Sequence, residues 1–231
     1  MSKYQLLCLP FAGAGASFFN EWKPYTERLD VLAVQLPGRE KRFCEPCYTD
    51  VFDAVAGILP EVSELVDADR KVIVFGHSLG AVLAYELTRS LATAGTCRIA
   101  GLVVSGSPDP WTPRKERATG LDDEEFLNRV SEFAGYTHSA LDDPLMRELL
   151  LPTLRADVQM HENYRPQAET RVDVPILMVR GSGDELISSE QLAGWKSATS
   201  ATAHAESLPG GHMYLTERPN ELLGLIEDLF L

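Results

Sequence analysis

The sequence predicts an α/β protein, built on a mostly parallel sheet with helices on both faces and one inserted helical cap. Short apolar runs alternate with longer helical patterns, which is typical of strand–helix units in a parallel sheet. Most of these runs are continuously apolar, as expected for strands covered on both faces. Only the stretch of about 109–166 lacks a convincing strand. We therefore expect a single domain over residues 1–231, with 109–166 inserted in it as a lid.

Six segments are candidate strands, and most of them have the apolar, often β-branched composition of buried strands. In chain order they are Gln5–Leu9, Val31–Gln35, Lys71–Phe75, Ile99–Ser105, Pro175–Arg180 and Ala203–Leu208. Helical patterns lie between and after them, at Phe18–Leu29, Tyr48–Val66, Leu79–Ala94, Ser188–Thr199 and Pro219–Leu231. Pro219 stands at the start of the last helix, where its missing N–H would have no helical partner anyway.

Two further helical patterns form the predicted lid. Asp122–Phe133 carries four acidic residues in its first turn, a placement that the helix dipole favours. Asp143–Glu162 begins with an Asp-Pro pair and continues with leucines at helical spacing. Because the core strands resume at Pro175, the segment is better described as an insertion than as a second domain.

Charge and hydropathy exclude several classes of partner. The 231 residues contain 21 Lys and Arg against 34 Asp and Glu, a net charge of −13. Such a chain lacks the excess of positive charge that binds a phosphate backbone, so we expect no nucleic-acid partner. Its apolar runs fall well short of the roughly 18 residues of a membrane span, and its N-terminal run is too short for a secretory signal. We expect a cytoplasmic protein without membrane contact.

The four cysteines predict neither a disulfide framework nor a metal site. They are too few and too irregularly spaced for a disulfide scaffold of this size. Cys44 and Cys47 form a CxxC pair, but no second pair or neighbouring histidine pair completes a zinc set. We expect reduced thiols, no metal and no cofactor.

The strongest chemical signal is a G-x-S-x-G motif at Gly76–Gly80. A buried strand precedes it and a helix follows, which is the context that places a serine on a sharp turn above a sheet. The serine, Ser78, also stands at a helix N-terminus, where developing negative charge is stabilised. Glycines are needed at both ends of the motif because side chains there would collide with the neighbouring strand and helix. The motif therefore predicts that Ser78 is a nucleophile.

A serine nucleophile needs a base, and His212 is the best candidate among the five histidines. It follows the last predicted strand, the position of the triad histidine in the chain order Ser, Asp, His. His77 adjoins the nucleophile, but its ring should point elsewhere and pack or order the turn. For His138, His161 and His204 we expect surface or packing roles.

The third member should be a carboxylate at the end of a strand between the serine and the histidine. Asp184 follows the strand at Pro175–Arg180 across a glycine-rich loop. Asp109, which follows the preceding strand, is a rival that spacing does not exclude. We favour Asp184 because its strand is the last before the one that leads to His212.

Two backbone N–H groups should form an oxyanion hole. One is expected from Leu79, the residue after the nucleophile. The other is expected from the small-residue loop after the first strand, in Leu9–Ser17, where we select Ala12. Small residues let the backbone approach a substrate closely.

These segments together resemble the type II thioesterases of polyketide synthase and nonribosomal peptide synthetase pathways, which belong to the α/β-hydrolase superfamily. The resemblance rests on Leu9–Gly13, Gln35–Glu40, Gly76–Gly80, Leu151–Asp157, Tyr164–Pro166 and Gly210–Met213, with Arg42, Glu45 and Pro46. It spans nearly the whole chain, and the LPGRE and LRAD segments are more specific than the serine motif. The family's triad falls on Ser78, Asp184 and His212.

The resemblance implies an α/β-hydrolase fold and hydrolysis of acyl groups from the phosphopantetheine arm of an acyl or peptidyl carrier protein. Such enzymes clear stalled or misprimed chains and need no metal or cofactor. The lid would form the acyl pocket, from its leucines with Phe133, Met146 and Met160.

We expect a monomer. Alternative functions are a medium-chain acyl-carrier-protein thioesterase, a general carboxylesterase, or a non-catalytic scaffold that binds carrier proteins.

Carrier proteins are usually acidic, so an enzyme of charge −13 should present a local basic patch to receive one. The sequence offers two candidate clusters for this patch. They are Arg39, Lys41 and Arg42, and Arg114, Lys115 and Arg117.

Overall fold

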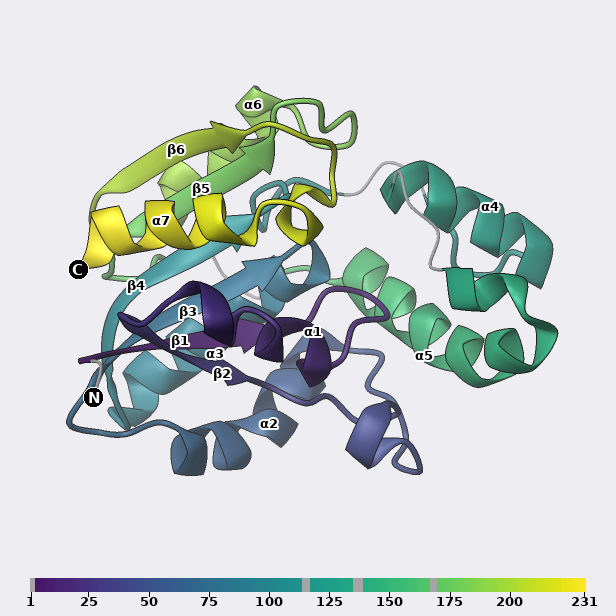
Figure 1. Ribbon diagram of the computed structural model, residues 1–231, viewed down its shortest axis with the longest axis horizontal. Coiled ribbons are helices and arrows are strands. Elements are labelled where there is room, and N and C mark those ends of the chain that lie inside the picture. The colour runs from purple at the N-terminus through teal and green to yellow at the C-terminus, as the bar shows by residue number, and fades with distance from the viewer. Residues whose placement is uncertain (1–2, 114–116, 135–138, 167–169) are drawn as a thin grey trace.

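The computed structural model describes residues 3–113, 117–134, 139–166 and 170–231, and in them the chain forms one six-stranded sheet (Figure 1). The strands are β1 (Tyr4–Leu9), β2 (Leu29–Ala33), β3 (Lys71–His77), β4 (Arg98–Ser105), β5 (Ile176–Gly181) and β6 (Ala203–Leu208). Their order is β2-β1-β3-β4-β5-β6, and all neighbouring strands run parallel. The carboxyl ends of all six strands therefore share one edge, where ligands bind in folds of this type.

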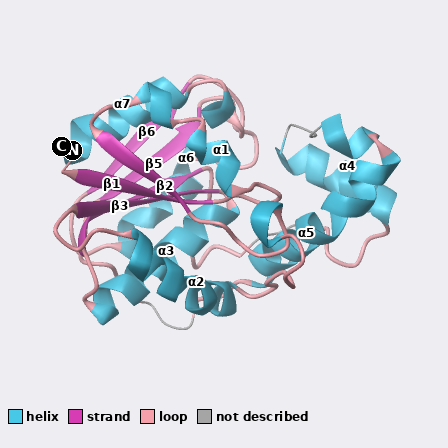
Figure 2. Cartoon of the chain, turned by 60° about the horizontal axis from the view of Figure 1, so that its bottom comes forward, coloured by secondary structure: helices cyan, strands magenta, loops and turns pink. Residues whose placement is uncertain are grey.

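Helices cover both faces of the sheet. Successive residues of a strand point to opposite sides, so the apolar strands present side chains for packing on each face. Leu7 and Leu9 of β1 pack with α2 (Val51–Leu65), α3 (Leu79–Ala94) and the segment around Trp195. Leu6 and Cys8 pack on the other face with α1 (Ala16–Asn20) and α7 (Pro219–Phe230). Figure 2 shows the two helical layers on either side of the strands. The predicted fold class, a parallel sheet with helices on both faces, is confirmed.

Two predicted helices are shorter than the pattern indicated. The predicted helix at Phe18–Leu29 forms only α1 and a 3₁₀ turn at Lys23–Tyr25, because Pro24 has no N–H for a continuing helix. The strand β2 then starts at Leu29 and ends two residues before the predicted end. The predicted helix at Ser188–Thr199 divides into α6 (Ser189–Ala193) and a 3₁₀ segment, Gly194–Ala198.

The segment between β4 and β5 contains α4 (Asp123–Ala134), a 3₁₀ turn at Ser139–Asp142 and α5 (Pro144–Asn163). Both helices were predicted, and they lie together beyond one end of the sheet (Figures 1 and 2). Residues Phe126, Leu141, Leu151, Leu154 and Val158 form a small apolar core between them. The four acidic residues at 122–125 are exposed, as expected. We call this segment the cap.

The remaining short elements are 3₁₀ turns at Glu40–Arg42 and Tyr214–Thr216. Within the described ranges, no helix combines the length and the apolar character that a bilayer crossing requires.

Candidate active site

The turn at Ser78 connects β3 to α3 in a strained conformation. Ser78 has φ +53° and ψ −116°, a region that residues other than glycine rarely adopt. Its N–H donates to the carbonyl of Ser105 on the adjacent strand at 2.8 Å. A Cβ on Gly76 would overlap the carbonyl of Gly80, and one on Gly80 would lie 2.5 Å from the carbonyl oxygen of Leu9. The two glycines are therefore required by close backbone contacts, as the motif predicted.

Asp184 and His212 meet at the carboxyl edge of the sheet. Asp184 lies in the loop after β5, and His212 lies in the loop after β6. His212 Nδ1 lies 2.9 Å from Asp184 Oδ2, and both side chains are buried. Because Nδ1 is engaged with the carboxylate, Nε2 is the ring atom that can exchange a proton elsewhere.

The carboxylate of Asp184 is held in its ionised form. Its Oδ1 accepts hydrogen bonds from the N–H groups of Leu186, at 2.9 Å, and Ile187, at 3.2 Å. Burial acts to raise the pKa of Asp184, but the bond and charge of His212 and these two N–H groups outweigh it. The pKa of Asp184 consequently lies below its ordinary value.

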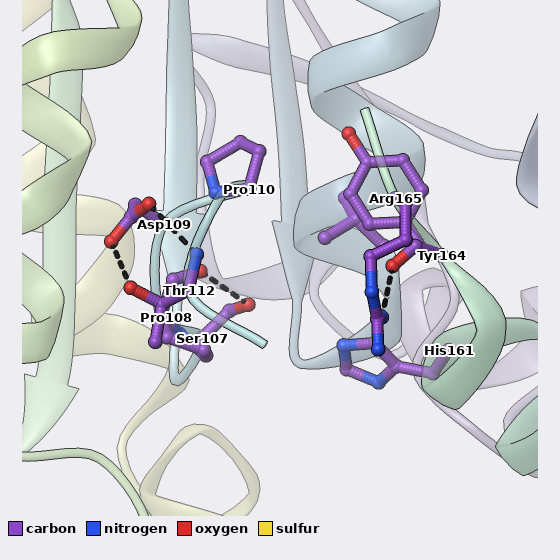
Figure 3. Close-up of a pocket in the computed structure, with 9 residues that line it drawn as sticks. Ser107, Pro108, Asp109, Pro110, Thr112, His161, Tyr164 and Arg165 are labelled. Atoms are coloured by element: carbon purple, nitrogen blue, oxygen red, sulfur yellow. Dashed lines mark hydrogen bonds between the residues drawn. The ribbon is translucent and has the colours of Figure 1, made fainter. Parts of the chain in front are cut away.

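Asp109, the rival acid, is engaged in its own loop. Its Oδ1 accepts from the N–H groups of Trp111 and Thr112, at 2.9 and 3.1 Å, and its Oδ2 accepts from the Thr112 hydroxyl at 2.6 Å. Figure 3 shows the bonds between Asp109 and Thr112 at one wall of a small pocket whose other wall carries His161, Tyr164 and Arg165. The geometry assigns Asp109 to the stabilisation of a turn.

A buried polar chain that the sequence did not predict lies beside His212. His77 Nδ1 lies 2.8 Å from Ser105 Oγ, which lies 2.7 Å from the hydroxyl of Tyr214. The ring centroids of His77 and His212 are 4.7 Å apart. Burial, and then the neighbouring charge of His212, hold the pKa of His77 well below its ordinary value, so it is neutral. The only sequence signal was Ser105, a hydroxyl at the end of a fully apolar strand.

The loop of the predicted oxyanion donor forms a tight turn. Ala14 N–H donates to the carbonyl of Phe11 at 3.0 Å, and Gly13 has a φ of +78° at the third position of this turn. A positive φ there is the requirement that glycine meets in type II turns. Ala12 stands between Phe11 and Gly13, and Leu79 is buried at the start of α3.

A cavity of about 570 Å³ opens between this loop and the cap. Its inner wall includes Phe11, Ala12 and Met213, the neighbour of His212. Its outer wall consists mainly of apolar cap residues, which include Leu127, Val130, Leu141, Met146, Leu149, Leu150 and Leu154. Of the other residues expected in the pocket, Met160 packs in the core instead, and the side chain of Phe133 lies outside the described part.

The predicted basic patch is wrong for Arg39, which is buried. Its guanidinium forms a two-pronged ion pair with Asp157 of α5, with both N–O distances at 2.7 Å. Lys41 is exposed, whereas Arg42 pairs with Glu45 and Glu61. A sequence alone does not show that two charges 118 residues apart neutralise each other in the interior.

The second predicted cluster is only partly visible. Arg114 and Lys115 lie outside the described residues. Arg117 donates to Asn163 at 2.6 Å and pairs with the buried carboxylate of Glu162. Among the residues that the structure describes, no group of three or more His, Cys, Asp or Glu side chains is arranged to hold a metal ion.

Comparison with known proteins identifies the family. The thioesterase domain model matches residues 4–230. The chain belongs to the thioesterase domain family. It is 31% identical to the gramicidin S biosynthesis protein GrsT of Aneurinibacillus migulanus, over 96% of this chain and 87% of GrsT. It is 32% identical to thioesterase PikA5 of Streptomyces venezuelae, over 100% of this chain and 82% of PikA5.

The fold of the thioesterase agrees with this assignment. The structure of BorB, a type II thioesterase from the borrelidin biosynthetic cluster, superposes with a TM-score of 0.84 at 32% identity, covering 98% of this chain and 91% of BorB. The protein is thus a serine thioesterase, and the sequence-based assignment to the type II thioesterases of polyketide and nonribosomal peptide pathways is confirmed.

The buried, neutral His77 predicts a pH dependence of stability. Because its folded-state pKa is depressed, the unfolded chain binds more protons once the pH falls below about 6.5, and stability falls with it. Replacing His77→Asn keeps a polar group for Ser105 but cannot titrate. We expect its free energy of unfolding, from urea denaturation, to fall less between pH 7 and pH 5 than that of the unmodified thioesterase. Equal falls in the two proteins would contradict the assignment of His77 as a buried neutral group.

Proposed function

We propose that this thioesterase hydrolyses acyl or aminoacyl thioesters on the phosphopantetheine arm of a carrier protein, with Ser78, His212 and Asp184 as its catalytic residues. The observation that carries the proposal is the Asp184–His212 hydrogen bond at the carboxyl edge of the sheet, the edge at which Ser78 follows β3 with a φ of +53°. The relatives support the substrate class, since GrsT is named for gramicidin S biosynthesis and BorB comes from a borrelidin cluster. Editing of stalled or misprimed chains is the corresponding biological role.

Acylation begins with proton transfer from Ser78 to His212 as the serine oxygen attacks the thioester carbonyl. The Asp184 carboxylate keeps the proton on Nδ1, so Nε2 faces the reaction as the base, and it stabilises the imidazolium that forms. Since the carboxylate stays ionised, this orientation persists across the working pH range. The C–S bond then breaks, and the pantetheine thiol leaves with the proton held by His212.

The proposed oxyanion donors are the N–H groups of Leu79 and Ala12. Leu79 begins α3, so its N–H belongs to the unpaired first turn of that helix, where the dipole favours negative charge. Ala12 stands in the glycine-stabilised turn at the edge of the cavity. Water, deprotonated by His212, attacks the acyl-serine carbonyl, and the same donors stabilise the second tetrahedral intermediate. The acid is released and Ser78 recovers its proton.

We propose that the acyl chain binds in the cavity between the cap and the Phe11–Ala14 turn. Its volume of about 570 Å³ falls in the range of small-molecule sites, and its outer wall is formed largely by leucines of the cap. Burial of an alkyl chain against such a wall contributes about 0.8 kcal/mol per methylene. The reaction as proposed uses only protein groups, without a metal or cofactor, and we propose that it takes place in the cytoplasm.

Replacing Ser78→Ala tests the nucleophile. The serine oxygen is the atom that accepts the acyl group, so we expect deacylation of an acyl-loaded carrier protein to slow by about 10³-fold or more. Intact-mass spectrometry of the carrier follows the reaction, and the unmodified enzyme should transiently carry the acyl mass. Deacylation by the alanine variant at the unmodified rate would refute the mechanism.

The two candidate acids can be separated by matched substitutions. Asp184→Asn keeps the shape of the side chain but loses the charge that selects the His212 tautomer, so we expect kcat to fall about 10²–10⁴-fold. Asp109→Asn weakens bonds to Trp111 and Thr112 and should cost about 1 kcal/mol in stability while leaving kcat within about threefold. The reverse ranking of kcat would assign the acid to Asp109.

Comparison of two thioesters of one acyl group tests the carrier protein as substrate. We expect kcat/KM for the acyl-carrier protein to exceed that for the N-acetylcysteamine thioester at least about tenfold, because contacts remote from the reacting bond add binding energy. Equal values would leave the thioesterase activity intact but remove the carrier protein from the proposal.

A further inference from the structure

Asp157 connects the cap to the loop of the proposed oxyanion donor. It lies on α5 and its side chain is fully buried. Its Oδ2 accepts from Gly13 N–H at 2.8 Å and from Arg39 Nη1 at 2.7 Å, and its Oδ1 accepts from Arg39 Nη2 at 2.7 Å. Arg39 Nη1 also donates to the carbonyl of Ala14 at 3.0 Å. One carboxylate and one guanidinium thus hold Gly13 and Ala14, the second half of the Phe11–Ala14 turn.

We propose that Asp157 and Arg39 are positioning residues for the thioesterase reaction, which set the direction of the Ala12 N–H through the Phe11–Ala14 turn. This inference rests on the proposed function, because it takes Ala12 as an oxyanion donor. Neither residue contacts the reacting atoms in the proposed mechanism. Both act through the backbone of the turn.

The geometry of the turn explains how this works. Gly13 adopts φ +78°, and the turn is closed by the Ala14 N–H bond to Phe11. Ala12 N–H lies in the same peptide plane as the Phe11 carbonyl, and the Ala14 N–H bond holds that carbonyl. The bond from Gly13 N–H to Asp157 fixes the following peptide plane, between Ala12 and Gly13, and Arg39 holds the carbonyl of Ala14. The two anchors leave the turn little freedom to rotate Ala12 N–H away from the substrate oxygen.

Stability alone is a poor account of this pair. A buried ion pair often contributes less than well-packed apolar side chains of similar volume, because both charges lose their hydration. The two-pronged Arg–carboxylate geometry, however, defines orientation more strictly than apolar contacts do. The third hydrogen bond of Asp157, from Gly13 N–H, connects this rigid pair to the turn.

The same contacts link catalysis to the position of the cap. On α5, Thr153 donates to the carbonyl of Gly38 at 2.7 Å, one turn before Asp157. A Cβ on Gly13 would lie 3.3 Å from Leu154 Cδ1, so α5 packs closely on the turn. Any displacement of α5 from the core removes the acceptor of Gly13 N–H. The oxyanion site is therefore complete only when α5 is seated.

Asp157→Asn tests the proposal, with Glu162→Gln as a matched control. The asparagine has one oxygen left, for which Arg39 and Gly13 N–H compete. Glu162 is also a buried α5 carboxylate, but it accepts from Ala118 and Thr119 N–H at 2.6 and 3.1 Å, in the cap's own loop. We expect Asp157→Asn to lower kcat about 10- to 100-fold with KM within about threefold, whereas Glu162→Gln keeps kcat. Equal losses in the two variants would overturn the proposal.

A second measurement separates positioning from folding. A medium-chain alkylboronic acid forms a tetrahedral adduct with a nucleophilic serine and places an oxygen in the oxyanion site, which the free fatty acid of equal length does not. In Asp157→Asn, we expect boronate affinity to fall in parallel with kcat while fatty-acid affinity is unchanged. Parallel losses of both affinities would indicate a merely structural role and reject the proposal.

The double variant Arg39→Met with Asp157→Leu removes both charges and gives the test if the single variants unfold. We expect it to fold, with kcat still reduced at least about tenfold because Gly13 N–H has lost its acceptor. A folded double variant with unmodified kcat would overturn the proposal. Failure of the proposed function would instead leave Ser78→Ala active, so the two failures are distinguishable.

Discussion

The close contact of backbone with backbone around Ser78 is the constraint on which the rest of the site depends. Gly80 approaches the carbonyl of Leu9 so closely that a Cβ has no room, and the Ser78 N–H bonds to β4. These contacts bring the ends of β1, β3 and β4 to one point. The strained φ of Ser78 persists because its neighbours leave it no alternative. The positions of the other groups follow, since each lies in a loop that leaves the same edge of the sheet.

Because all strands of the sheet are parallel, residues from different strands and loops meet at this one edge. The ends of five different strands supply the groups at this edge: loops carry the turn at Ala12, the serine, Asp184 and His212, and Ser105 is the last residue of β4. The polar chain from His77 through Ser105 to Tyr214 fills the space beneath His212 with neutral groups. A positive charge on His77 would oppose the imidazolium that the proposed mechanism forms at His212. The charged group bonded to His212 is instead the carboxylate of Asp184, which stabilises the developing positive charge.

The sequence predicted those parts of the molecule that have a local signature. Strand, turn and helix around Ser78 follow one another directly, and the glycine-rich loops before Asp184 and His212 follow the last two strands, the buried β5 and the edge strand β6. The sequence could not predict the pairing of Arg39 with Asp157, because burial and partnership depend on tertiary contacts. For this reason the sequence predicted Arg39 to be a surface charge, whereas it is buried in an ion pair. The helix expected at Phe18–Leu29 failed for a local reason, since one proline outweighed a good apolar period.

The correction of Arg39 changes what the net charge of −13 means for the thioesterase. A sum of charges suggests that an acidic partner needs a compensating basic patch. The structure shows instead that two residues of the first predicted cluster are paired with carboxylates, Arg39 with Asp157 and Arg42 with Glu45. Their charges cancel over a few ångströms and give little field at a distance. A substitution at Arg39 would therefore act on the catalytic step through the Ala12 turn, rather than on the encounter with a carrier protein. The sequence alone assigns Arg39 to recognition of a carrier protein. By its contacts with Asp157 and Ala14, its guanidinium acts instead on the position of the Ala12 turn.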